Sequence, residues 1–248
     1  MTKTKYTETH AEPRKRLSLC KKILIAFFVL ILALVSTVFI AYSRYLYPTG
    51  NITADLYAIR NNRNNIPMVN FFLLQVGEKY IAIDAGSDST QTENELRKLG
   101  ISADDIIAVF VTHSHYDHIA SLHLFSNATL YTGNTEFQYA TIPRFSPDFF
   151  ELPNIPHIIM DNGESIELYG TTIKCIYTPG HTSDSVSYLI DSKYLFVGDL
   201  LIRGVSPYNT ELRLLHIENI LEMDEVKYIF TGHFGLFKDI KFFRWWLG

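Results

Sequence analysis

Four β-rich runs of this chain end in a histidine or an aspartate, and this pattern restricts the possible folds more than any other feature. VFVT is followed by His113, IYTPG by His181, YLFVG by Asp199 and YIFTG by His233. In layered α/β proteins, ligands gather at the carboxyl ends of strands, where the chain leaves the sheet for a loop. We therefore expect the four exits to converge on one site.

The richest exit is VTHSHYDHIA, residues 111–120, which places three of the chain's nine histidines within six positions. Imidazoles this close repel one another when protonated, and their burial without partners is unfavourable. Neutral imidazoles and carboxylates together are ligands for zinc, iron or manganese. A metal centre therefore explains why these side chains lie together.

The spacing divides the candidate ligands between two ions. His113 and His115 lie two residues apart, so in an extended segment they point to the same side and can bind one ion. Asp117 and His118 follow as the chain turns into a helix, and they can face a second ion. The remaining predicted ligands are His181 for the first ion, His233 for the second and Asp199 as a bridge. Two ions about 3.5–4 Å apart can hold a hydroxide and polarise an acyl or phosphoryl oxygen.

An uncharged apolar run, ILIAFFVLILALVSTVFIAY, occupies residues 23–42. A helix of this length spans roughly 30 Å, the hydrocarbon thickness of a bilayer. Lysine and arginine are concentrated before the run, which predicts a cytoplasmic N-terminus and an extracytoplasmic remainder. The alternative is a cleavable signal peptide, whose apolar core usually has about 7–15 residues and ends at small residues. Because VFIAYSRYLY is a poor cleavage site, we favour an uncleaved signal anchor.

The chain is thus expected to contain a cytoplasmic basic segment (residues 1–22), a transmembrane signal anchor (23–42), a linker with the start of the domain (43–67) and one folded domain (68–248). Roughly 200 residues after the anchor suffice for one well-cored domain. The net charge of −4 combines a basic anchor region with a more acidic outer domain. This balance gives no sign of a nucleic-acid-binding face, so we expect a small-molecule substrate and, through the anchor, a membrane as partners.

Short β-rich runs separated by turn signals follow the anchor. Residues 68–77 and 80–86 predict two strands around a turn at Gly77–Glu78. Residues 90–100 predict a helix that ends at Gly100. Further strands are expected at 106–113, 128–133, 164–170, 171–180, 185–190, 193–199 and 226–233, and short helices near 118–125 and 211–222.

The pattern H-x-H-x-D-H at residues 113–118, with histidine, aspartate and histidine downstream, resembles the metallo-β-lactamase-fold hydrolases over about residues 68–235. The resemblance implies an αββα sandwich, in which helices face two mixed sheets and the metals lie at one edge. It implies that Asp84, in AIDAG, supports the metal ligands without binding metal itself. It also implies that Asp117 both binds the second metal and orients the attacking water. Two zinc ions are the implied cofactor, with iron or manganese as alternatives.

Some residues of this chain differ from those of individual branches of the family, and these differences narrow the range of candidate substrates. Asp199 stands where the metallo-β-lactamases proper usually carry cysteine or serine, which weighs against β-lactam hydrolysis. Glyoxalase-II enzymes share THSHYDH but favour glycine where Ser121 stands. Quorum-quenching lactonases place a tyrosine shortly after the bridging aspartate, whereas DLLIRGVSPY delays one until Tyr208. HTSDS, residues 181–185, replaces a more usual Pro-Gly pair, which alters a turn.

The sequence therefore predicts a membrane-anchored dinuclear hydrolase, in which a metal-bridging hydroxide attacks an ester, thioester, lactone or related acyl bond. A mononuclear-iron sulfur dioxygenase of the same fold, a phosphodiesterase and a non-catalytic metal-binding module are the alternatives. The complete second-metal set counts against the dioxygenase, and the non-catalytic module should lack a ligand. Arg144, Arg203 and Tyr208 are weaker candidates for binding substrate, and the two arginines have a solvated surface charge as the simpler explanation.

Overall fold

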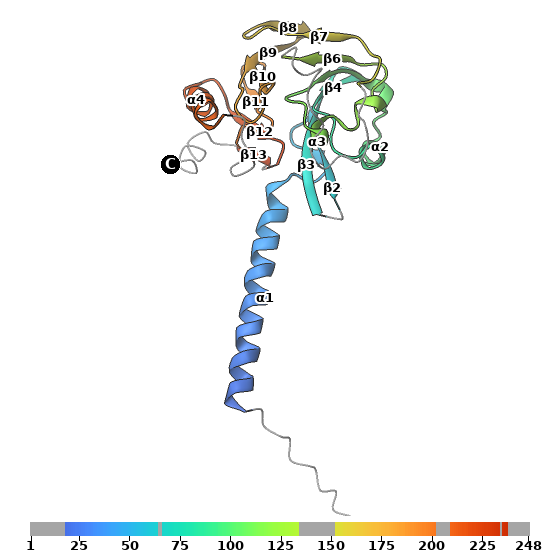
Figure 1. The fold of residues 1–248 in the computed structure, drawn as a ribbon. Coiled ribbons are helices and arrows are strands. Elements are labelled where there is room, and N and C mark those ends of the chain that lie inside the picture. Colours follow the sequence, from blue (N-terminus) through green and yellow to red (C-terminus); the bar gives the residue numbers. More distant parts are fainter. Residues whose placement is uncertain (1–17, 64–65, 134–151, 202–208, 234, 238–248) are drawn as a thin grey trace, which may run out of the picture. The chain divides into compact units, whose positions relative to one another are not determined.

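The computed structural model describes residues 18–63, 66–133, 152–201, 209–233 and 235–237 (Figure 1). The chain forms two compact units, Met1–Tyr42 and Ser43–Gly248. The first unit contains most of one long helix, and the second contains the sheets.

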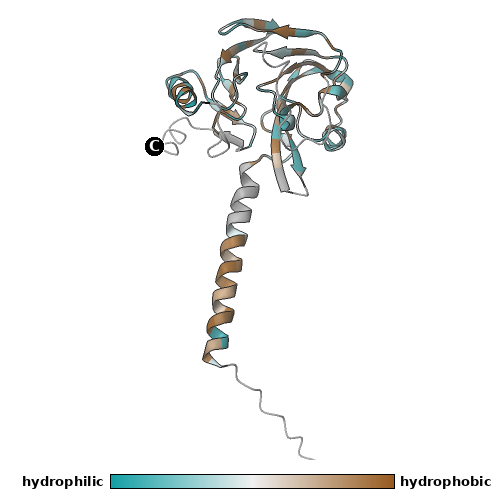
Figure 2. Ribbon diagram, viewed as in Figure 1, coloured by the Kyte–Doolittle hydropathy of each residue, from teal (hydrophilic) through white to brown (hydrophobic). Residues whose placement is uncertain are grey.

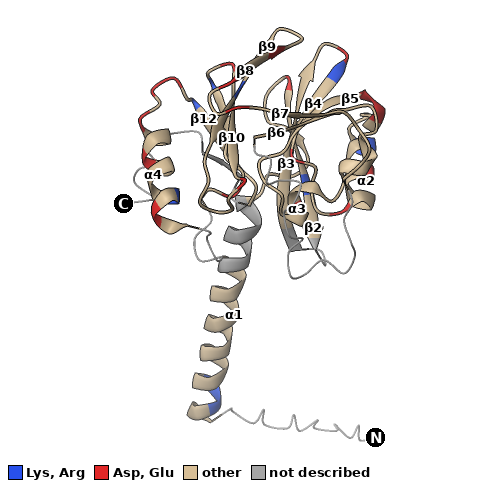
Figure 3. Ribbon diagram, turned by 45° about the horizontal axis from the view of Figure 1, so that its top comes forward, with Lys and Arg blue, Asp and Glu red and all other residues tan. Residues whose placement is uncertain are grey.

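Helix α1 (Leu19–Tyr45) carries the apolar run. Between Leu19 and Thr37 it is long and apolar enough to cross a membrane, and none of these side chains is buried in the protein. Figure 2 shows hydrophobic residues along these turns, and Figure 3 shows charge only at the start of the helix in this part. A signal sequence near an N-terminus can meet the same criteria of length and composition, so the helix is a candidate membrane span.

Within the described residues the first sheet has seven strands, in chain order from β1 to β7. Neighbours from β1 to β4 pair antiparallel, and those from β4 to β7 pair parallel. The strands are β1 (Gly50–Asn51), β2 (Leu56–Arg63), β3 (Ile66–Val76), β4 (Lys79–Ile83), β5 (Ile106–Phe110), β6 (Thr129–Thr132) and β7 (His157–Ile159). The sheet is therefore mixed.

The second sheet has six described strands in the order β13-β12-β11-β10-β9-β8. Only β11 and β12 pair parallel, and the other neighbours pair antiparallel. The strands are β8 (Ser165–Leu168), β9 (Thr171–Tyr177), β10 (Val186–Ile190), β11 (Tyr194–Phe196), β12 (Tyr228–Thr231) and β13 (Gly235–Phe237). This sheet is also mixed.

Aromatic side chains fill the space between the two sheets. Phe72 of β3 lies 5.3 Å from Phe196 of β11 and 5.1 Å from Phe230 of β12, measured between ring centroids. Phe110 of β5 lies 5.2 Å from Tyr188 of β10. All of these rings belong to one buried cluster. Large rings of this kind bury much apolar area, so the two sheets pack face to face.

Helices cover the outer face of each sheet. On the first sheet these are α2 (Ser89–Lys98) and α3 (Tyr116–Ile119), and on the second it is α4 (Thr210–Leu221). Leu96 and Ile119 pack against the first sheet in a second buried cluster. Ile217 and Ile220 pack against Leu195 of the second sheet in a third. Three apolar layers separate four layers of structure, which confirms the αββα sandwich.

The local turn signals are confirmed. β3 and β4 are joined at Gly77, whose φ of 66° lies in the left-handed region that favours glycine. Helix α2 ends at Lys98, and Gly100 follows with a φ of 72°. Its N–H donates to the carbonyl oxygen of Arg97, which satisfies one of the last helical carbonyls.

Four strands were not predicted, namely β1, β2, β7 and β13. The first sheet therefore begins at Gly50, within the segment that was expected to hold the linker and the start of the domain. β2 interrupts its apolar pattern with Asn61, which is fully buried. The other three strands have two or three residues each, too few to show a period of two.

A matched pair of leucines tests the packing of α4 on the second sheet. Leu195 is fully buried beneath the helix, whereas Leu214 on the helix is 49% exposed. We expect Leu195→Ala to lower the free energy of unfolding by about 2–5 kcal/mol, because the cavity adds to the lost transfer energy. Leu214→Ala should change it by no more than about 0.5 kcal/mol. Denaturant unfolding of the two variants measures both changes. Equal changes would contradict the packing of α4 on the second sheet.

Candidate metal centre

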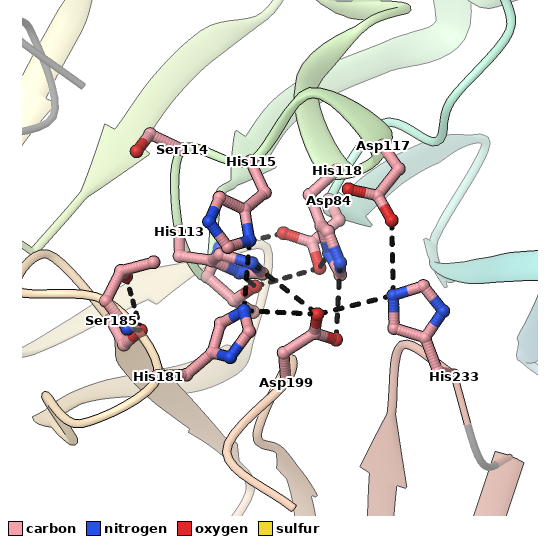
Figure 4. A network of polar contacts seen from close by, with 12 residues as sticks. Asp84, His113, Ser114, His115, Asp117, His118, His181, Ser185, Asp199 and His233 are labelled. Atoms are coloured by element: carbon pink, nitrogen blue, oxygen red, sulfur yellow. Dashed lines mark hydrogen bonds and ion pairs between the residues drawn. The ribbon is translucent and has the colours of Figure 1, made fainter. Parts of the chain in front are cut away.

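The structure brings all seven predicted metal ligands together (Figure 4). They form two groups, in each of which the candidate ligand atoms lie within 4.8 Å of one another. The first group is His113, His115, His181 and Asp199, and the second is Asp117, His118 and His233.

Both sheets contribute to the site at the ends of strands. His113 lies three residues after β5, and His115 directly precedes α3 in extended backbone. Asp117 and His118 lie in the short α3 itself. The second sheet supplies the remaining three, from the segments after β9, β11 and β12: His181, Asp199 and His233.

Asp199 lies between the two groups. Its Oδ2 is 3.4 Å from His181 Nε2 and 3.7 Å from His113 Nε2, both in the first group. In the second group, its Oδ1 is 3.3 Å from His118 Nε2, and its Oδ2 is 3.3 Å from His233 Nε2. The carboxylate is buried. It is therefore placed to be shared by two ions.

Hydrogen bonds behind the site fix which nitrogen of the two histidines of the second group faces it. His118 Nδ1 lies 2.8 Å from Asp84 Oδ2, and His233 Nδ1 lies 2.6 Å from the carbonyl oxygen of Met68. Both partners accept, so each Nδ1 carries the proton and each Nε2 offers its lone pair to the site. That tautomer is the one in which Nε2 can bind a metal.

Asp84 is the centre of this support. Its carboxylate accepts from the backbone N–H of Thr112 at 2.8 Å and from the Thr112 hydroxyl at 3.0 Å, as well as from His118. The same hydroxyl oxygen lies 3.1 Å from His113 Nδ1 and can accept a hydrogen bond from the N–H there. Asp84 has a φ of 64°, a conformation that aspartate tolerates better than most residues. One carboxylate thus orients a ring in each group.

The buried atoms at the centre fit a metal. His113 Nε2, His118 Nε2 and Asp199 Oδ1 are buried and have no hydrogen-bond partner among the described residues. Burial of such atoms without a partner is unfavourable, whereas metal ions in the two groups would satisfy all three. Imidazole and carboxylate without thiolate suit zinc, iron or manganese.

The backbone beside His233 leaves no room for a side chain. A Cβ at Gly232 would lie 2.6 Å from His118 Cε1 and 2.9 Å from Asp199 Oδ1. β3 holds this turn, because the Asn70 N–H donates to the Gly232 carbonyl oxygen at 2.8 Å. Glycine is therefore required here by the closeness of the ligands.

Burial keeps the histidines of the first group neutral. It lowers the pKa of His181 to about 4 and the pKa of His113 well below its ordinary value. Burial also lowers the pKa of His115. Neutral imidazole is the form that binds a metal, so this group needs no deprotonation at neutral pH.

The pKa values of the histidines in the second group are shifted in the opposite direction. Burial lowers the pKa of His233, but the carboxylates of Asp199 and Asp117 outweigh it and raise the pKa to about 10. The pKa of His118 is likewise raised well above its ordinary value, because Asp199 and Asp84 outweigh burial. Without a metal, protons on these two rings balance the buried carboxylates.

The weaker substrate candidates, Arg144, Arg203 and Tyr208, lie outside the described residues. Conversely, three supporting groups had no predicted role. Thr112 is signalled only as a hydroxyl in an otherwise apolar run, and Asp184 only as an acid within HTSDS. The third is the carbonyl oxygen of Met68, and a backbone atom leaves no signal in the sequence.

A sequence model described as the metallo-beta-lactamase superfamily matches residues 65–233. The probable polyketide biosynthesis zinc-dependent hydrolase BaeB of Bacillus velezensis is 30% identical over 122 residues, which are 48% of each chain. The N-acyl homoserine lactonase of Bacillus cereus is 22% identical over 239 residues, covering 76% of this chain and 92% of the lactonase. A hydroxyacylglutathione hydrolase of Actinobacillus pleuropneumoniae is 25% identical over 143 residues, covering 56% of this chain and 55% of the hydrolase.

The chain spans between about half and two thirds of the length of the first curated relatives it matches. Among solved structures, a metallo-beta-lactamase family protein from Thermus thermophilus superposes with a TM-score of 0.64 at 20% identity. The superposition covers 79% of each chain. A likeness at this identity shows the fold.

The opposite pKa shifts predict that the two groups lose metal at different pH. Protons compete for His118 and His233, whose pKa values are raised, but not for His113 and His181, whose pKa values are lowered. On acidification from about pH 8 to about pH 5.5, the second group should therefore release its ion first. Zinc retained after gel filtration at each pH measures this. Release of both ions at one pH, or of the first group's ion before the second's, would contradict it.

Proposed function

The chain belongs to the metallo-beta-lactamase superfamily, and on that premise we propose that it is a dinuclear zinc hydrolase of acyl bonds. The observation that carries the proposal is the presence of two complete groups of ligands with Asp199 between them. A single-iron dioxygenase would use only His113, His115 and His181, and would leave Asp117, His118 and His233 without a purpose.

Two ions in this site would lower the pKa of a water between them and polarise a carbonyl oxygen of the substrate. Asp117 is the residue that we assign to orient that water. Its side chain is 22% exposed and that of His233 is 18% exposed, whereas those of His113, His118 and Asp199 are 3% exposed or less. Asp117 therefore lies on the side of the site that water and substrate can reach.

The proposed substrates are esters, thioesters and lactones. All three present a carbonyl carbon to a nucleophile and develop negative charge on the oxygen in the transition state. The names of the lactonase and of the hydroxyacylglutathione hydrolase among the relatives support this class. The name of BaeB supports zinc as the metal.

Loss of a single ligand should strongly reduce turnover. Full-length protein purified without chelator or added metal should contain about two zinc ions per chain. His115→Ala and Asp199→Ala should each lower kcat/KM for a lactone or thioester by about 100-fold or more, since even groups that only support ligands are worth 10–100-fold. Elemental mass spectrometry and initial rates measure the two effects.

Asp191→Asn is the matched control. Asp191 is exposed, and its carboxylate accepts from the Thr172 N–H on β9 at 2.9 Å, away from the ligands. It should keep wild-type metal content and rate. One iron per chain would contradict the dinuclear zinc proposal, and hydrolysis confined to phosphodiesters in the same panel would contradict the acyl class.

We further propose that α1 is an uncleaved anchor with its N-terminus in the cytoplasm. Lys21 and Lys22 lie in its first turns, and the charge-free stretch follows them. Basic residues on the cytoplasmic flank of a span set this orientation.

The two native cysteines allow a direct test of the orientation. Cys20 is exposed at the start of α1, whereas Cys175 is buried and its burial raises the pKa of its thiol to about 12. Because the thiolate is the reactive form, only Cys20 should react with maleimide. A membrane-impermeant maleimide should label Cys20 in cells only after the membrane is permeabilised.

A second variant tests on which side of the membrane the domain after α1 lies. In a Cys20→Ser background, Tyr169→Cys introduces a thiol at a position whose native side chain is 70% exposed. This thiol should react in intact cells. Labelling of Cys20 without permeabilisation would reverse the orientation, and loss of Cys20 from the mature chain would show that the segment is a cleaved signal.

A further inference from the structure

The loop between β9 and β10 does more than carry His181. It is hydrogen-bonded to the segment that carries His113 and His115. The Val186 N–H donates to the Thr112 carbonyl oxygen at 2.8 Å, and the Ser114 N–H donates to Asp184 Oδ2 at 3.0 Å. The backbone on both sides of His113 is therefore held by this loop and by the first residue of β10.

Asp184 is well placed to keep that contact rigid. It is 6% exposed, and Ser114 is 5% exposed. The turn around Asp184 is closed on itself, because the Ser185 hydroxyl oxygen accepts from the Thr182 N–H at 3.1 Å and the Thr182 carbonyl oxygen accepts from the Gly180 N–H at 3.0 Å. Both the turn that carries the Asp184 carboxylate and the Ser114 N–H that the carboxylate binds are therefore held in place.

We propose that Asp184 is a positioning residue for the first metal ion. Its bond to Ser114 fixes the N–H of the single residue between His113 and His115, and so sets the spacing of these two rings relative to His181. Its carboxylate also places negative charge in a buried region where the three imidazoles supply none.

The arrangement parallels that of Asp84 on the other side of the site. Asp84 accepts directly from the ring of His118 in the second group. Asp184 acts instead through the backbone of the first group. Asp184 therefore gives the first group a second buried carboxylate, besides Asp84 acting through Thr112, that supports its ligands without belonging to the ligand set.

The inference rests on the proposed two-ion site, and metal affinity tests it without any substrate. Full-length protein in detergent is titrated with zinc against a chromophoric chelator, which gives two dissociation constants. His181→Ala and His233→Ala identify which constant belongs to which group. Asp184→Ala removes both the hydrogen-bond acceptor and the charge, whereas Asp184→Asn keeps an acceptor oxygen and removes only the charge. Asp191→Asn is the control, because it removes the charge of an exposed carboxylate that also accepts a hydrogen bond from a backbone N–H.

We expect Asp184→Ala to raise the dissociation constant of the first group by about 10–100-fold, the usual effect of losing a group that orients a ligand. Asp184→Asn should raise it less, the second group should keep its affinity in both, and Asp191→Asn should change neither constant. Wild-type affinity of the first group in both Asp184 variants would overturn the inference. So would equal weakening of both groups, which indicates a general structural role.

Two further outcomes separate this inference from the function proposed above. A wild-type protein that binds no zinc would overturn both. Two tightly bound ions that are unaffected by any change at Asp184 would overturn only the role of Asp184. If Asp184→Ala does not fold, the conservative Asp184→Asn decides, since it retains an acceptor for the Ser114 N–H.

Discussion

The carboxylate of Asp84 is the interaction on which the site depends. It binds Thr112 after β5 and His118 on α3, while Asp84 itself directly follows β4. Three adjacent segments of the first sheet and its helix layer therefore meet at one buried anion. Because hydrogen bonds to an ionised group are the stronger kind, this contact fixes ring orientation more firmly than packing alone. Aspartate is also one of the few residues that tolerates the left-handed backbone found there.

The buried negative charge explains the division between the two groups of ligands. Asp84, Asp117 and Asp199 all face His118 or His233, and such a set of anions is stable only with positive charge among them. This positive charge is supplied either by protons on the imidazoles or by a metal ion that replaces these protons. The first group has neutral rings and no competing proton, so its geometry is ready for an ion. Its ligands depend instead on how well two loops are held together.

The sequence predicted the strands that have a clear apolar pattern and the metal ligands that follow them. His113, His181, Asp199 and His233 each follow an apolar strand, and strand ends of a layered fold meet at one edge. The contacts that hold these ligands were harder to predict. The carbonyl oxygen of Met68 has no residue-specific signal, and Asp184 reaches Ser114 across 70 positions of sequence. β2 was missed because the buried Asn61 breaks its apolar alternation, although that amide oxygen accepts from the Ser87 N–H.

The division of the ligands between the two sheets has a consequence for folding. The first sheet is built from residues 50–159 and the second from residues 165–237, so the two halves of the sandwich are consecutive in the chain. Each of the two groups takes histidines from both halves. An ion bound in either group therefore acts as a cross-link between halves that can each pair their own strands first. Binding at 100 times the dissociation constant stabilises such a docked state by about 2.7 kcal/mol. The availability of metal in the compartment where the chain folds would then help to determine how long the interior faces of the sheets stay apart.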